Sequence, residues 1–424
     1  MTLLTQMKQK ERIHEHEQKR QAFYQTIDAF WHDLFEEPYA LYDIKAMSTT
    51  MVNEIRDVTT KIASIYDKTA VLLRELPDES LQELGLPEKA IPFVREKVLP
   101  VEGIIRRIDL VQTEEGWKHY EINADTPTFI YELNHVNGKV ANHFGYRDVN
   151  EGCEQQLAEA IQKGIYFSHP SEQVPKIVFT AHSDHEEDWN TLAYLARLCQ
   201  LPHELVPIDE LRVQEGIGVF TPSGEKIDVL YRQTYPIEHL VDDKAEDGTD
   251  IGVELLKVVQ EKKLAILNPL SSFLLQSKAV QVLIWGLHES GHEFFSEEEH
   301  QWIHSYFLPT YLEKDVFLKQ GVKFIEKPSF GREGDTIVIY DEHGNPEQEN
   351  ENRTYDDSLK IYQAYQELPQ ETVMTPYGQT KAHLLVGSFV IGNEAGAIGI
   401  RAGEKITGNE SCFLPIAIAD ECDL

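Results

Sequence analysis

The chain has 424 residues, 41% of them hydrophobic, which is enough for a large core and for two or three intertwined lobes. Its 72 acidic residues against 39 Lys and Arg give a formal net charge of −33, which argues against nucleic acid or an anionic membrane as a partner. This acidity would favour a cationic substrate such as a polyamine, although acidic surfaces also serve solubility alone.

Cysteine usage and hydropathy place the chain in a reducing compartment. The four cysteines are scattered and lack the spacing of a zinc site or a disulfide framework: Cys153, Cys199, Cys412 and Cys422. The N-terminus is highly charged without an apolar signal core, and no apolar run reaches membrane-spanning length. We therefore expect a cytoplasmic protein outside the membrane, and the composition leaves its oligomeric state open.

The first hundred residues predict a helical region. Apolar residues recur at helical spacings of three and four at Phe23, Ile27, Phe30, Trp31 and Leu34. Helical patterns continue over residues 51–65 and 69–76, so most of residues 3–86 is expected to be helical.

Residues 104–128 predict a β-hairpin. If Glu114, Glu115 and Gly116 form its loop, Asp109 lies opposite Glu121 and Arg107 lies opposite Asn123. Because strand side chains alternate, these four polar side chains share one face. The other face is expected to belong to the core and to carry Ile108, Leu110, Tyr120 and Ile122.

The two acids of this hairpin need a cationic partner. Asp109 directly opposite Glu121 is unfavourable unless a cation lies between them. A hard divalent ion suits two carboxylates and the Asn123 amide oxygen, with substrate phosphates completing its coordination. The alternative is a solvated hairpin whose charges face water. The small polar loop at 124–128 and the positive fork of Arg107 favour the ion-binding hypothesis.

The pattern Arg-x-Asp, followed after twelve residues by Glu-x-Asn-Ala-Asp, resembles the synthetase domain of the glutathionylspermidine synthase family, which has an ATP-grasp fold. The resemblance implies that Mg²⁺ is bound by Asp109, Glu121 and Asn123. It further implies that Arg107 lies near the reacting phosphate and carboxylate.

The resemblance places the acid substrate at Thr126 and Thr128, where this chain has Thr-Pro-Thr in place of a Ser-Ala-Ser type of loop. Some members of the family carry an N-terminal cysteine amidase domain. Because no cysteine precedes Cys153 and the chain is too short for such a domain, no amidase activity is expected.

Residues 176–199 predict a buried strand, a polar loop and a helix from about Trp189, a unit that often binds ligands beyond the strand end. Glu186 and Glu187 resemble a family position that faces the substrate, although acids also stabilise a helix N-terminus through its dipole. A second strand carries Arg232, which is expected either to project into the central cleft or to form a salt bridge.

The nucleotide-binding lobe is expected to begin near residue 264, where a strand precedes an apolar helix at 277–285. On sequence alone Lys278 is a surface lysine of that helix. The resemblance makes it a candidate phosphate ligand, although this chain lacks the Trp and Asn expected just upstream.

The second specific motif is a pair of strands at 322–340 joined by a glycine-flanked loop. Such strands can close over a triphosphate and present backbone N–H groups and a lysine to it, whereas Gly-x-x-Gly alone also describes an ordinary hairpin. The run after Lys327 nearly matches the grasp loop of the resembled family. The resemblance implies that Lys327 binds the α- and β-phosphates and that the loop closing over ATP contains Phe330, Gly331, Arg332, Glu333 and Gly334.

Residues 341–355, rich in Asn, Glu and Gly, predict a mobile surface insertion. The following segment at 359–369 predicts a strand ending in a hinge. The resemblance implies that it borders adenine, through Gln363 and through the backbone around Glu367. The alternative is a plain edge strand.

A last hairpin is predicted over residues 383–401, with its turn at 392–396. The resemblance implies that Arg401 points into the site opposite Arg107, where a guanidinium would stabilise charge on a transferred phosphoryl group. A strand-end arginine can equally be structural.

The resemblance covers residues 103–415, and the predicted metal ligands precede the grasp lysine in the sequence. That order fits an α/β (α+β) protein with a circularly permuted ATP-grasp fold of glutathione synthetase type. We expect a helical region at 1–100, a pre-ATP-grasp and substrate region at 101–262, and a nucleotide-binding region at 263–424.

The function implied is that of an ATP-dependent carboxylate–amine ligase that uses ATP and Mg²⁺ and forms an amide through an acyl phosphate. Its partners would be a small-molecule acid, such as glutathione or another short peptide, and an amine such as a polyamine. Two alternatives stay open: a catalytically silent ATP-binding regulatory protein, and a kinase-like phosphotransferase, which would leave a stable phosphorylated product.

Overall fold

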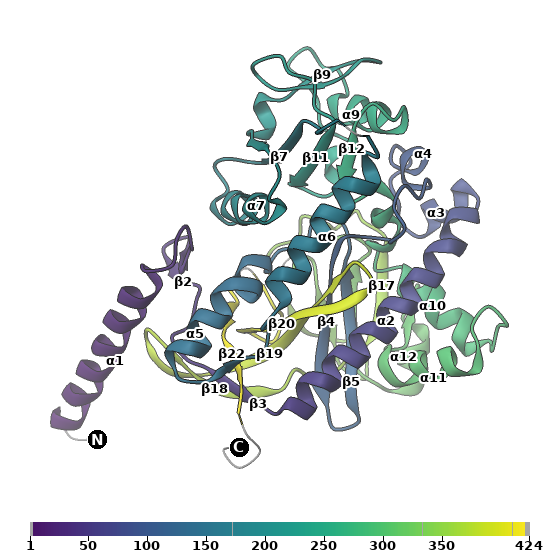
Figure 1. Cartoon of the computed structure of the whole chain (residues 1–424). Coiled ribbons are helices and arrows are strands. Elements are labelled where there is room, and N and C mark those ends of the chain that lie inside the picture. Colours follow the sequence, from purple (N-terminus) through teal and green to yellow (C-terminus); the bar gives the residue numbers. More distant parts are fainter. Residues whose placement is uncertain (1–2, 172, 333, 409, 420–424) are drawn as a thin grey trace.

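The computed structural model describes residues 3–171, 173–332, 334–408 and 410–419 and has a mixed α/β architecture, as predicted (Figure 1). The helices are α1 (Leu3–Tyr24), α2 (Thr49–Glu75), α3 (Asp78–Glu83), α4 (Ile91–Val94), η1 (Glu132–Val136), α5 (Asn137–His143), α6 (Cys153–Ser168), α7 (Glu186–Cys199), η2 (Ile208–Glu210), α8 (Ile237–Leu240), α9 (Ile251–Gln260), η3 (Leu270–Leu275), α10 (Val280–Glu289), α11 (Glu297–Tyr306) and α12 (Asp315–Gln320). In the described part of the chain, no helix is both long and apolar enough to cross a membrane.

The largest sheet joins the predicted site hairpin to the C-terminal strands. Its strands are antiparallel in the order β21-β20-β19-β4-β5, with β18 paired to β19. Their bounds are β4 (Ile105–Thr113), β5 (Gly116–Asn123), β18 (Gln370–Thr375), β19 (Gly378–Ile391), β20 (Glu394–Gly403) and β21 (Cys412–Leu414).

Two further sheets complete the framework. An antiparallel sheet of order β13-β17-β14-β15-β16 contains β13 (Thr310–Tyr311), β14 (Phe324–Pro328), β15 (Val338–Tyr340), β16 (Pro346–Glu349) and β17 (Lys360–Ala364). A parallel sheet of order β12-β11-β7-β8 contains β7 (Ile177–Ala181), β8 (His203–Leu205), β11 (Val229–Gln233) and β12 (Ala265–Leu267). Sheets therefore combine strands from both sides of residue 262, and the predicted division into three regions stays a prediction.

Three small sheets are also present among the described residues, and one of them joins the N-terminal region to later strands. One has the order β3-β22-β6 and contains β3 (Lys45–Met47), β6 (Arg147–Asp148) and β22 (Ile416–Ile418). Two strand pairs are formed by β1 (Asp33–Leu34) with β2 (Glu37–Pro38) and by β9 (Arg212–Gln214) with β10 (Gly218–Phe220).

The helix predicted through residues 23–34 is wrong. The chain leaves α1 after Tyr24, and Ala29, Phe35 and Glu36 have φ values of 50°, 52° and 66°, in the left-handed region that interrupts a helix. Ile27, Phe30 and Trp31 are nevertheless buried. The spacing therefore predicted correctly that these side chains are buried, but the backbone that carries them is not helical. By contrast, the patterns at 51–65 and 69–76 belong to the single helix α2.

The hairpin has the predicted pairing at its polar end and a different turn. Asp109 pairs with Glu121 and Arg107 with Asn123, as expected. The loop contains only two residues, because Thr113 pairs with Gly116, and a β-bulge next to Asp109 absorbs the shift of one residue.

This bulge changes the predicted core face. His119, fully buried, takes the core position and its Nε2 lies 2.8 Å from the Tyr66 hydroxyl. Tyr120, predicted to face the core, instead lies beside Lys327, whose Nζ is 4.6 Å from the ring centroid. The bulge therefore turns one aromatic side chain from the core toward the candidate site.

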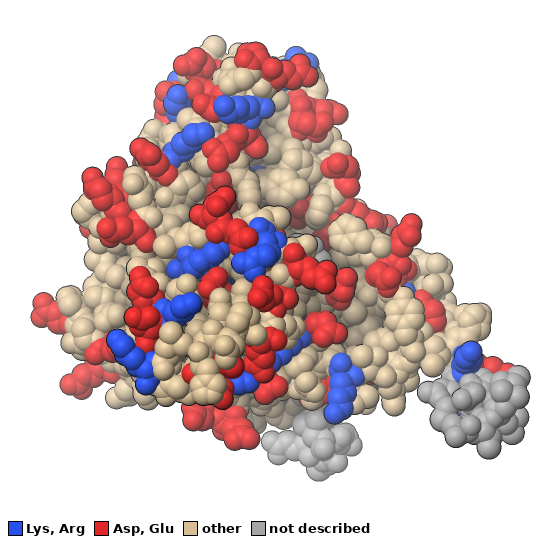
Figure 2. All heavy atoms as spheres, turned by 180° about the vertical axis from the view of Figure 1, so that it is seen from behind, with Lys and Arg blue, Asp and Glu red and all other residues tan. Residues whose placement is uncertain are grey.

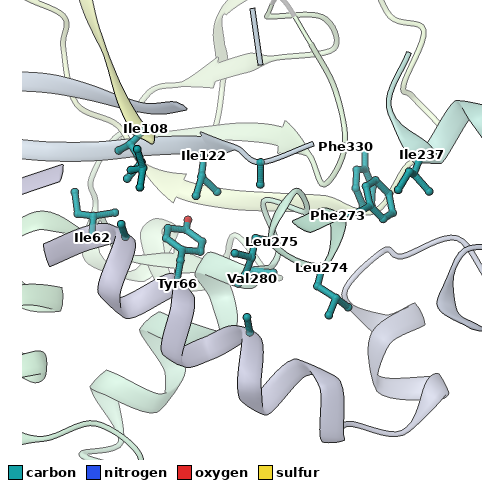
Figure 3. Close-up of a cluster of buried hydrophobic side chains, with 14 of the residues drawn as sticks. Ile62, Tyr66, Ile108, Ile122, Ile237, Phe273, Leu274, Leu275, Val280 and Phe330 are labelled. Carbon is teal, nitrogen blue, oxygen red and sulfur yellow. The ribbon is translucent and has the colours of Figure 1, made fainter. Parts of the chain in front are cut away.

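The hairpin rests on α2. Figure 3 shows Ile62 and Tyr66 of α2 directed toward Ile108 and Ile122 of the hairpin, and all four are buried. Because strand side chains alternate, the polar face of the hairpin points away from α2.

The N-cap of α2 gives a first stability prediction. Ser48 accepts a hydrogen bond from the Met51 backbone N–H at 3.1 Å. Replacing Ser48 by alanine is expected to lower the free energy of unfolding by about 1 kcal/mol, because one N–H at the helix start loses its partner. Urea unfolding measures this loss, and Ser48→Asp, which keeps an acceptor, should retain most of the stability. Equal losses in both variants would contradict the capping role.

Two C-terminal expectations need correction. The last hairpin turns at Gly392 and Asn393, because Ile391 pairs with Glu394, so its turn is shorter than predicted. The segment 341–355 lies at the surface, as predicted, but part of it forms β16, which extends the sheet beside β15. Its far end contacts the glycine-rich loop, since Thr354 N donates to an Asp335 carboxylate oxygen at 3.0 Å.

Candidate active site

Two adjoining pockets lie where the hairpin, the glycine-rich loop and α7 meet. The larger is a cleft of about 550 Å³, and the smaller, of about 70 Å³, extends it between β5 and the sheet of β14 and β15. The residues that line both are Glu121, Arg332, Gly334, Asp335, Leu385 and Thr407. Because the pockets share these walls, one ligand could extend through both.

Arg107 and Asp109 form a buried ion pair at the cleft. The Arg107 Nε and Nη2 donate to the two Asp109 carboxylate oxygens at 2.7 and 3.0 Å, and both side chains are about 95% buried. The third arm, Nη1, donates to the Thr128 carbonyl oxygen at 3.0 Å. The guanidinium crosses β19 at Gly387, where a Cβ would lie 3.2 Å from the Arg107 Cδ. Glycine at that position makes room for the arginine.

Arg401 reaches the same loop from β20. Its Nη2 donates to the Thr128 hydroxyl at 3.1 Å, and its guanidinium lies 5.2 Å from the Phe129 ring centroid. Thr128 is therefore held by both arginines, which come from strands almost 300 residues apart. The structure brings together Arg107 and Arg401 as the sequence predicted.

Glu121 and Asn123 complete the polar face of the hairpin. The Lys278 Nζ lies 3.4 Å from a Glu121 carboxylate oxygen. Burial alone would raise the pKa of Glu121, but the charges of Lys278, Lys327 and Arg107 outweigh it and lower this pKa to about 2. Glu121 is thus an anion at any physiological pH.

These hairpin residues fit a hard divalent cation. The Asn123 Nδ2 is buried without a hydrogen-bond partner in the described structure, so its amide is not committed elsewhere in the protein. Two carboxylates and one amide oxygen on paired strands form the all-oxygen donor set that Mg²⁺ prefers. No group of three or more His, Cys, Asp or Glu side chains among the described residues is arranged to hold a metal ion. An ion at the hairpin would therefore rely on Asn123 and on oxygens of a ligand.

Lys327 points from β14 into the smaller pocket and is held from behind. Its Nζ donates to the Gln363 Oε1 at 2.8 Å, and the Gln363 Nε2 donates in turn to Gln281 and Thr310 at 2.9 and 3.2 Å. Burial lowers the pKa of Lys327 to about 8. Gln363, fully buried, thus uses its whole amide inside the protein and does not line the pocket.

Lys278 lies in the turn before α10, not on the helix surface. Its backbone N–H donates to the Ser329 carbonyl at 2.8 Å, and its Nζ donates to the Gly331 carbonyl at 3.0 Å. Only 7% of Lys278 is exposed, and it lines the smaller pocket beside Lys327. The structure therefore brings the two predicted phosphate ligands together.

The glycine-rich loop is anchored at one end and reaches the cleft at the other. Phe330 stacks on Phe273 with ring centroids 5.1 Å apart, as Figure 3 shows. Arg332 extends to the Thr126 carbonyl at 3.5 Å. Gly334 has a φ of 70°, and a Cβ there would lie 2.9 Å from the Thr407 carbonyl oxygen, so this position requires glycine. The predicted site residue Glu333 lies outside the described residues.

The predicted adenine contacts are met only in part. Glu367 is exposed, while its neighbours Tyr365 and Leu368 line the smaller pocket. The Gln366 carbonyl accepts a hydrogen bond from the Tyr120 hydroxyl, which joins this hinge to the hairpin. Apolar and aromatic side chains, not a free amide, therefore form the pocket wall here.

The predicted substrate residues separate into two groups. Thr126, Thr128 and Glu187 line the cleft, whereas Glu186 is exposed and lies outside the cleft lining. Arg232 is also outside that lining: its Nη2 donates to an Asp125 carboxylate oxygen, and both side chains are nearly fully buried. Of the two roles that the sequence left open for Arg232, the geometry favours the salt bridge.

Several cleft residues escaped prediction. Tyr39, His185, Tyr235 and Tyr355 line the cleft but come from segments assigned to a helix or to polar loops. Behind the cleft, Tyr39 donates to the fully buried Glu132 at 2.5 Å. Glu132 lies between Tyr131 and Leu133 in the sequence, a weak sign of a buried acid, and no comparable signal marks the other four residues.

Acidic charge covers the molecule widely. Figure 2 shows Asp and Glu side chains spread over the face in view, with Lys and Arg side chains among them near its middle, in its upper part and along its lower edge. The net charge of −33 is thus dispersed, and on this face it does not form one docking surface for a cationic partner.

Comparisons with known proteins found a matching family model, a relative in sequence and a solved structure of similar fold. The model of a family described as "Glutathionylspermidine synthase preATP-grasp" matches residues 9–419. A protein of Haemophilus influenzae provisionally assigned as an acid–amine ligase is 24% identical over 321 residues, which cover 73% of each chain. A solved glutathione synthetase-like effector from Globodera pallida, in its apo form, has a TM-score of 0.63 at 9% identity and covers 96% of this chain and 97% of that one. This last likeness is one of fold.

Proposed function

The chain belongs to the glutathionylspermidine synthase preATP-grasp family, as its motifs indicated, and from this premise we propose that it is an ATP-dependent ligase that joins a carboxylic acid to an amine. The observation that carries the proposal is the meeting, in two adjoining pockets, of two arginines, the hairpin acids and two buried lysines. An acid–amine ligase assignment of the Haemophilus influenzae relative supports the same reaction class. We further propose the circularly permuted ATP-grasp order of elements and the three predicted regions.

In the proposed reaction, the substrate carboxylate attacks the γ-phosphate of ATP and gives an acyl phosphate and ADP. The amine then attacks the acyl carbon and displaces phosphate. Arg107 and Arg401, which meet at Thr128, would hold the carboxylate and stabilise the charge that develops on the transferred phosphoryl group. No side-chain nucleophile is needed.

The remaining site residues would bind the nucleotide and Mg²⁺ and would shield the acyl phosphate from water. Lys278 and Lys327 would hold the phosphate tail, with the base and ribose beyond them against the hinge. Asp109, Glu121 and Asn123 would hold Mg²⁺, which when bound supplies positive charge for the β- and γ-phosphates. The loop from Phe330 to Asp335 would exclude water, because hydrolysis of the acyl phosphate would waste the ATP.

The substrate identities are part of the proposal. Thr126, Thr128 and Arg332 would contact the acid, for which glutathione and other short peptides or amino acids are candidates. Glu187 would face the amine, for which polyamines are candidates, since the cleft presents a carboxylate there. Gln363 is proposed to act through Lys327, and not on adenine as the resemblance implied.

The test is ADP release from Mg-ATP against glutathione, γ-glutamyl and other short peptides and free amino acids, each with and without polyamines. ADP formation that needs both an acid and an amine, with a new amide seen by mass spectrometry and lost in Asp109→Asn, supports the ligase. A stable phosphorylated product would instead identify a phosphotransferase. A rise in melting temperature with Mg-ATP but no turnover would favour the silent binding protein, and no rise at all would refute the ATP site.

Nucleotide affinity is expected to depend on pH through Lys327. In the free protein its pKa is about 8, so the ammonium loses its charge as the pH rises above that value. Bound phosphates need the charged form and would raise this pKa. Binding therefore takes up a proton, and the affinity for ATP should fall by up to about tenfold per pH unit above the pKa of the free site.

Isothermal titration calorimetry in two buffers of different ionisation enthalpy measures this proton uptake. Lys327→Arg is the matched control, because arginine stays charged throughout the range and should remove the pH dependence. An unchanged pH dependence in Lys327→Arg would show that another group is responsible.

A further inference from the structure

A buried acid behind the cleft has no role in the reaction described so far. Glu132, at the start of the π-helix η1, is fully buried, and its Oε1 accepts a hydrogen bond from the Tyr39 hydroxyl at 2.5 Å. Its Oε2 is buried with no partner among the described residues. An unpaired carboxylate oxygen in this position is costly unless a proton or a donor reaches it. Short π-helices are also frequent at functional sites.

Glu132 is joined to the cleft wall through Tyr39. Tyr39, which donates a hydrogen bond to Glu132, lines the cleft together with Glu187. Arg107, Arg401 and Thr128 line the same cleft. Charged or titratable groups on several elements act on Glu187. They include His185 and Asp188 at the start of its own helix, Glu132 on η1, Tyr39 just after β2, Arg401 on β20 and Arg107 on β4.

Both acids are harder to ionise than an ordinary glutamate. Burial, followed by the charges of Glu132 and Asp188, raises the pKa of Glu187 to about 8. Burial also raises the pKa of Glu132, although the Tyr39 hydrogen bond opposes the shift. Arg401 lowers both values but does not reverse either shift. Without a ligand, the cleft thus contains one carboxyl group, that of Glu187, whose pKa of about 8 lies within the working range of an enzyme.

The amine step of the proposed ligase requires such a group. An alkyl amine arrives as an ammonium ion, and its nitrogen has no free electron pair until a proton is removed. A proton acceptor is most effective when its pKa lies near the operating pH. An ammonium ion beside Glu187 would favour the ionised carboxylate and so prepare the acceptor.

We propose that Glu187 accepts the proton of the substrate ammonium group, and that Glu132, held by Tyr39, is a positioning residue that keeps this carboxylate able to do so. The inference rests on the proposed ligase function. The Glu187 carboxylate takes one proton, the freed electron pair of nitrogen forms the C–N bond, and the acyl C–O bond breaks. Phosphate leaves with the electron pair of the broken C–O bond and takes the second proton from nitrogen. The products are the amide, hydrogen phosphate and a neutral Glu187.

Hydroxylamine separates this step from the rest of the reaction. It is largely neutral at neutral pH and traps acyl phosphates as hydroxamates without a proton acceptor. Wild type, Glu187→Gln, Glu132→Gln and the exposed control Glu151→Gln are each assayed with Mg-ATP and the acid panel, once with hydroxylamine and once with spermidine. The amide-forming kcat/KM is recorded against pH.

In the wild type, kcat/KM for the amine should rise with pH and level off above about 8, where free Glu187 is ionised. Glu187→Gln should lose amide formation about 10²-fold and keep hydroxamate formation. In Glu132→Gln the rising limb should move to lower pH by about one unit, because the negative charge that Glu132 gains when it loses its proton no longer opposes the ionisation of Glu187. Glu151→Gln should match the wild type.

Two results would overturn the inference. One is a rising limb in Glu132→Gln at the wild-type pH, and the other is equal loss of amide and hydroxamate in a Glu187→Gln variant that melts at the wild-type temperature, which would place Glu187 in a step before the attack of the amine. A wild type that forms no hydroxamate with any acid would instead refute the ligase function itself, and the inference with it.

Discussion

Replacing Arg107 by lysine is expected to lower the rate of ADP release about 10³-fold while the protein remains folded. Arginine uses three nitrogens here: two bind the Asp109 carboxylate at 2.7 and 3.0 Å, and the third binds the Thr128 carbonyl at 3.0 Å. A lysine ammonium is a single point of charge and cannot reproduce the planar fork. It could neutralise Asp109 or reach a transferring phosphoryl group, but not hold both in one geometry.

The measurement is steady-state ADP release with Mg-ATP and the acid and amine that the panel identifies. Arg197→Lys is the matched control, because the Arg197 side chain is 49% exposed and pairs with Asp28 at the surface. The control should retain nearly full activity. Activity within tenfold of wild type in Arg107→Lys would remove this arginine from the reaction and leave it as a structural partner of Asp109.

The sequence predicted best what is local. The pairing of Asp109 with Glu121 was accessible because it depends on alternation within two strands joined by one turn. The β-bulge that places His119 in the core and Tyr120 at Lys327 was not, because it depends on contacts with α2 and β14, which are remote in sequence. The sequence therefore predicted how the polar residues of the hairpin pair, but not the aromatic side chain beside Lys327.

For the other residues, prediction was limited because their contacts join positions that are far apart in the sequence. Glu132 meets Tyr39 across 93 residues and Arg232 meets Asp125 across 107 residues, and neither separation leaves a periodic signal. The helix predicted through residues 23–34 failed for a related reason. A spacing of three and four marks side chains that are buried together, and a chain of turns with left-handed residues can bury them as well as a helix does.

The Asp125–Arg232 pair gives the largest expected effect on stability. Asp125 is 2% exposed; one carboxylate oxygen accepts from the Arg232 Nη2 and the other accepts from the Ile237 backbone N–H at 3.0 Å. Asp125→Asn is expected to lower the free energy of unfolding by about 3–5 kcal/mol, because it leaves the buried guanidinium without an anion. Arg232→Met should cost a similar amount by leaving the carboxylate unpaired.

Urea unfolding of both single variants and of the double variant measures the coupling. The double variant should recover part of the loss, since neither charge is then buried alone. The matched control is the exposed pair of Arg197 and Asp28, where Arg197→Met should change stability by only about 0–1 kcal/mol. Additive losses in the double variant would show that the two side chains are not coupled. An Arg232→Met variant that is fully stable but unable to turn over substrate would instead support a role for this arginine in the cleft, the other possibility that the sequence left open.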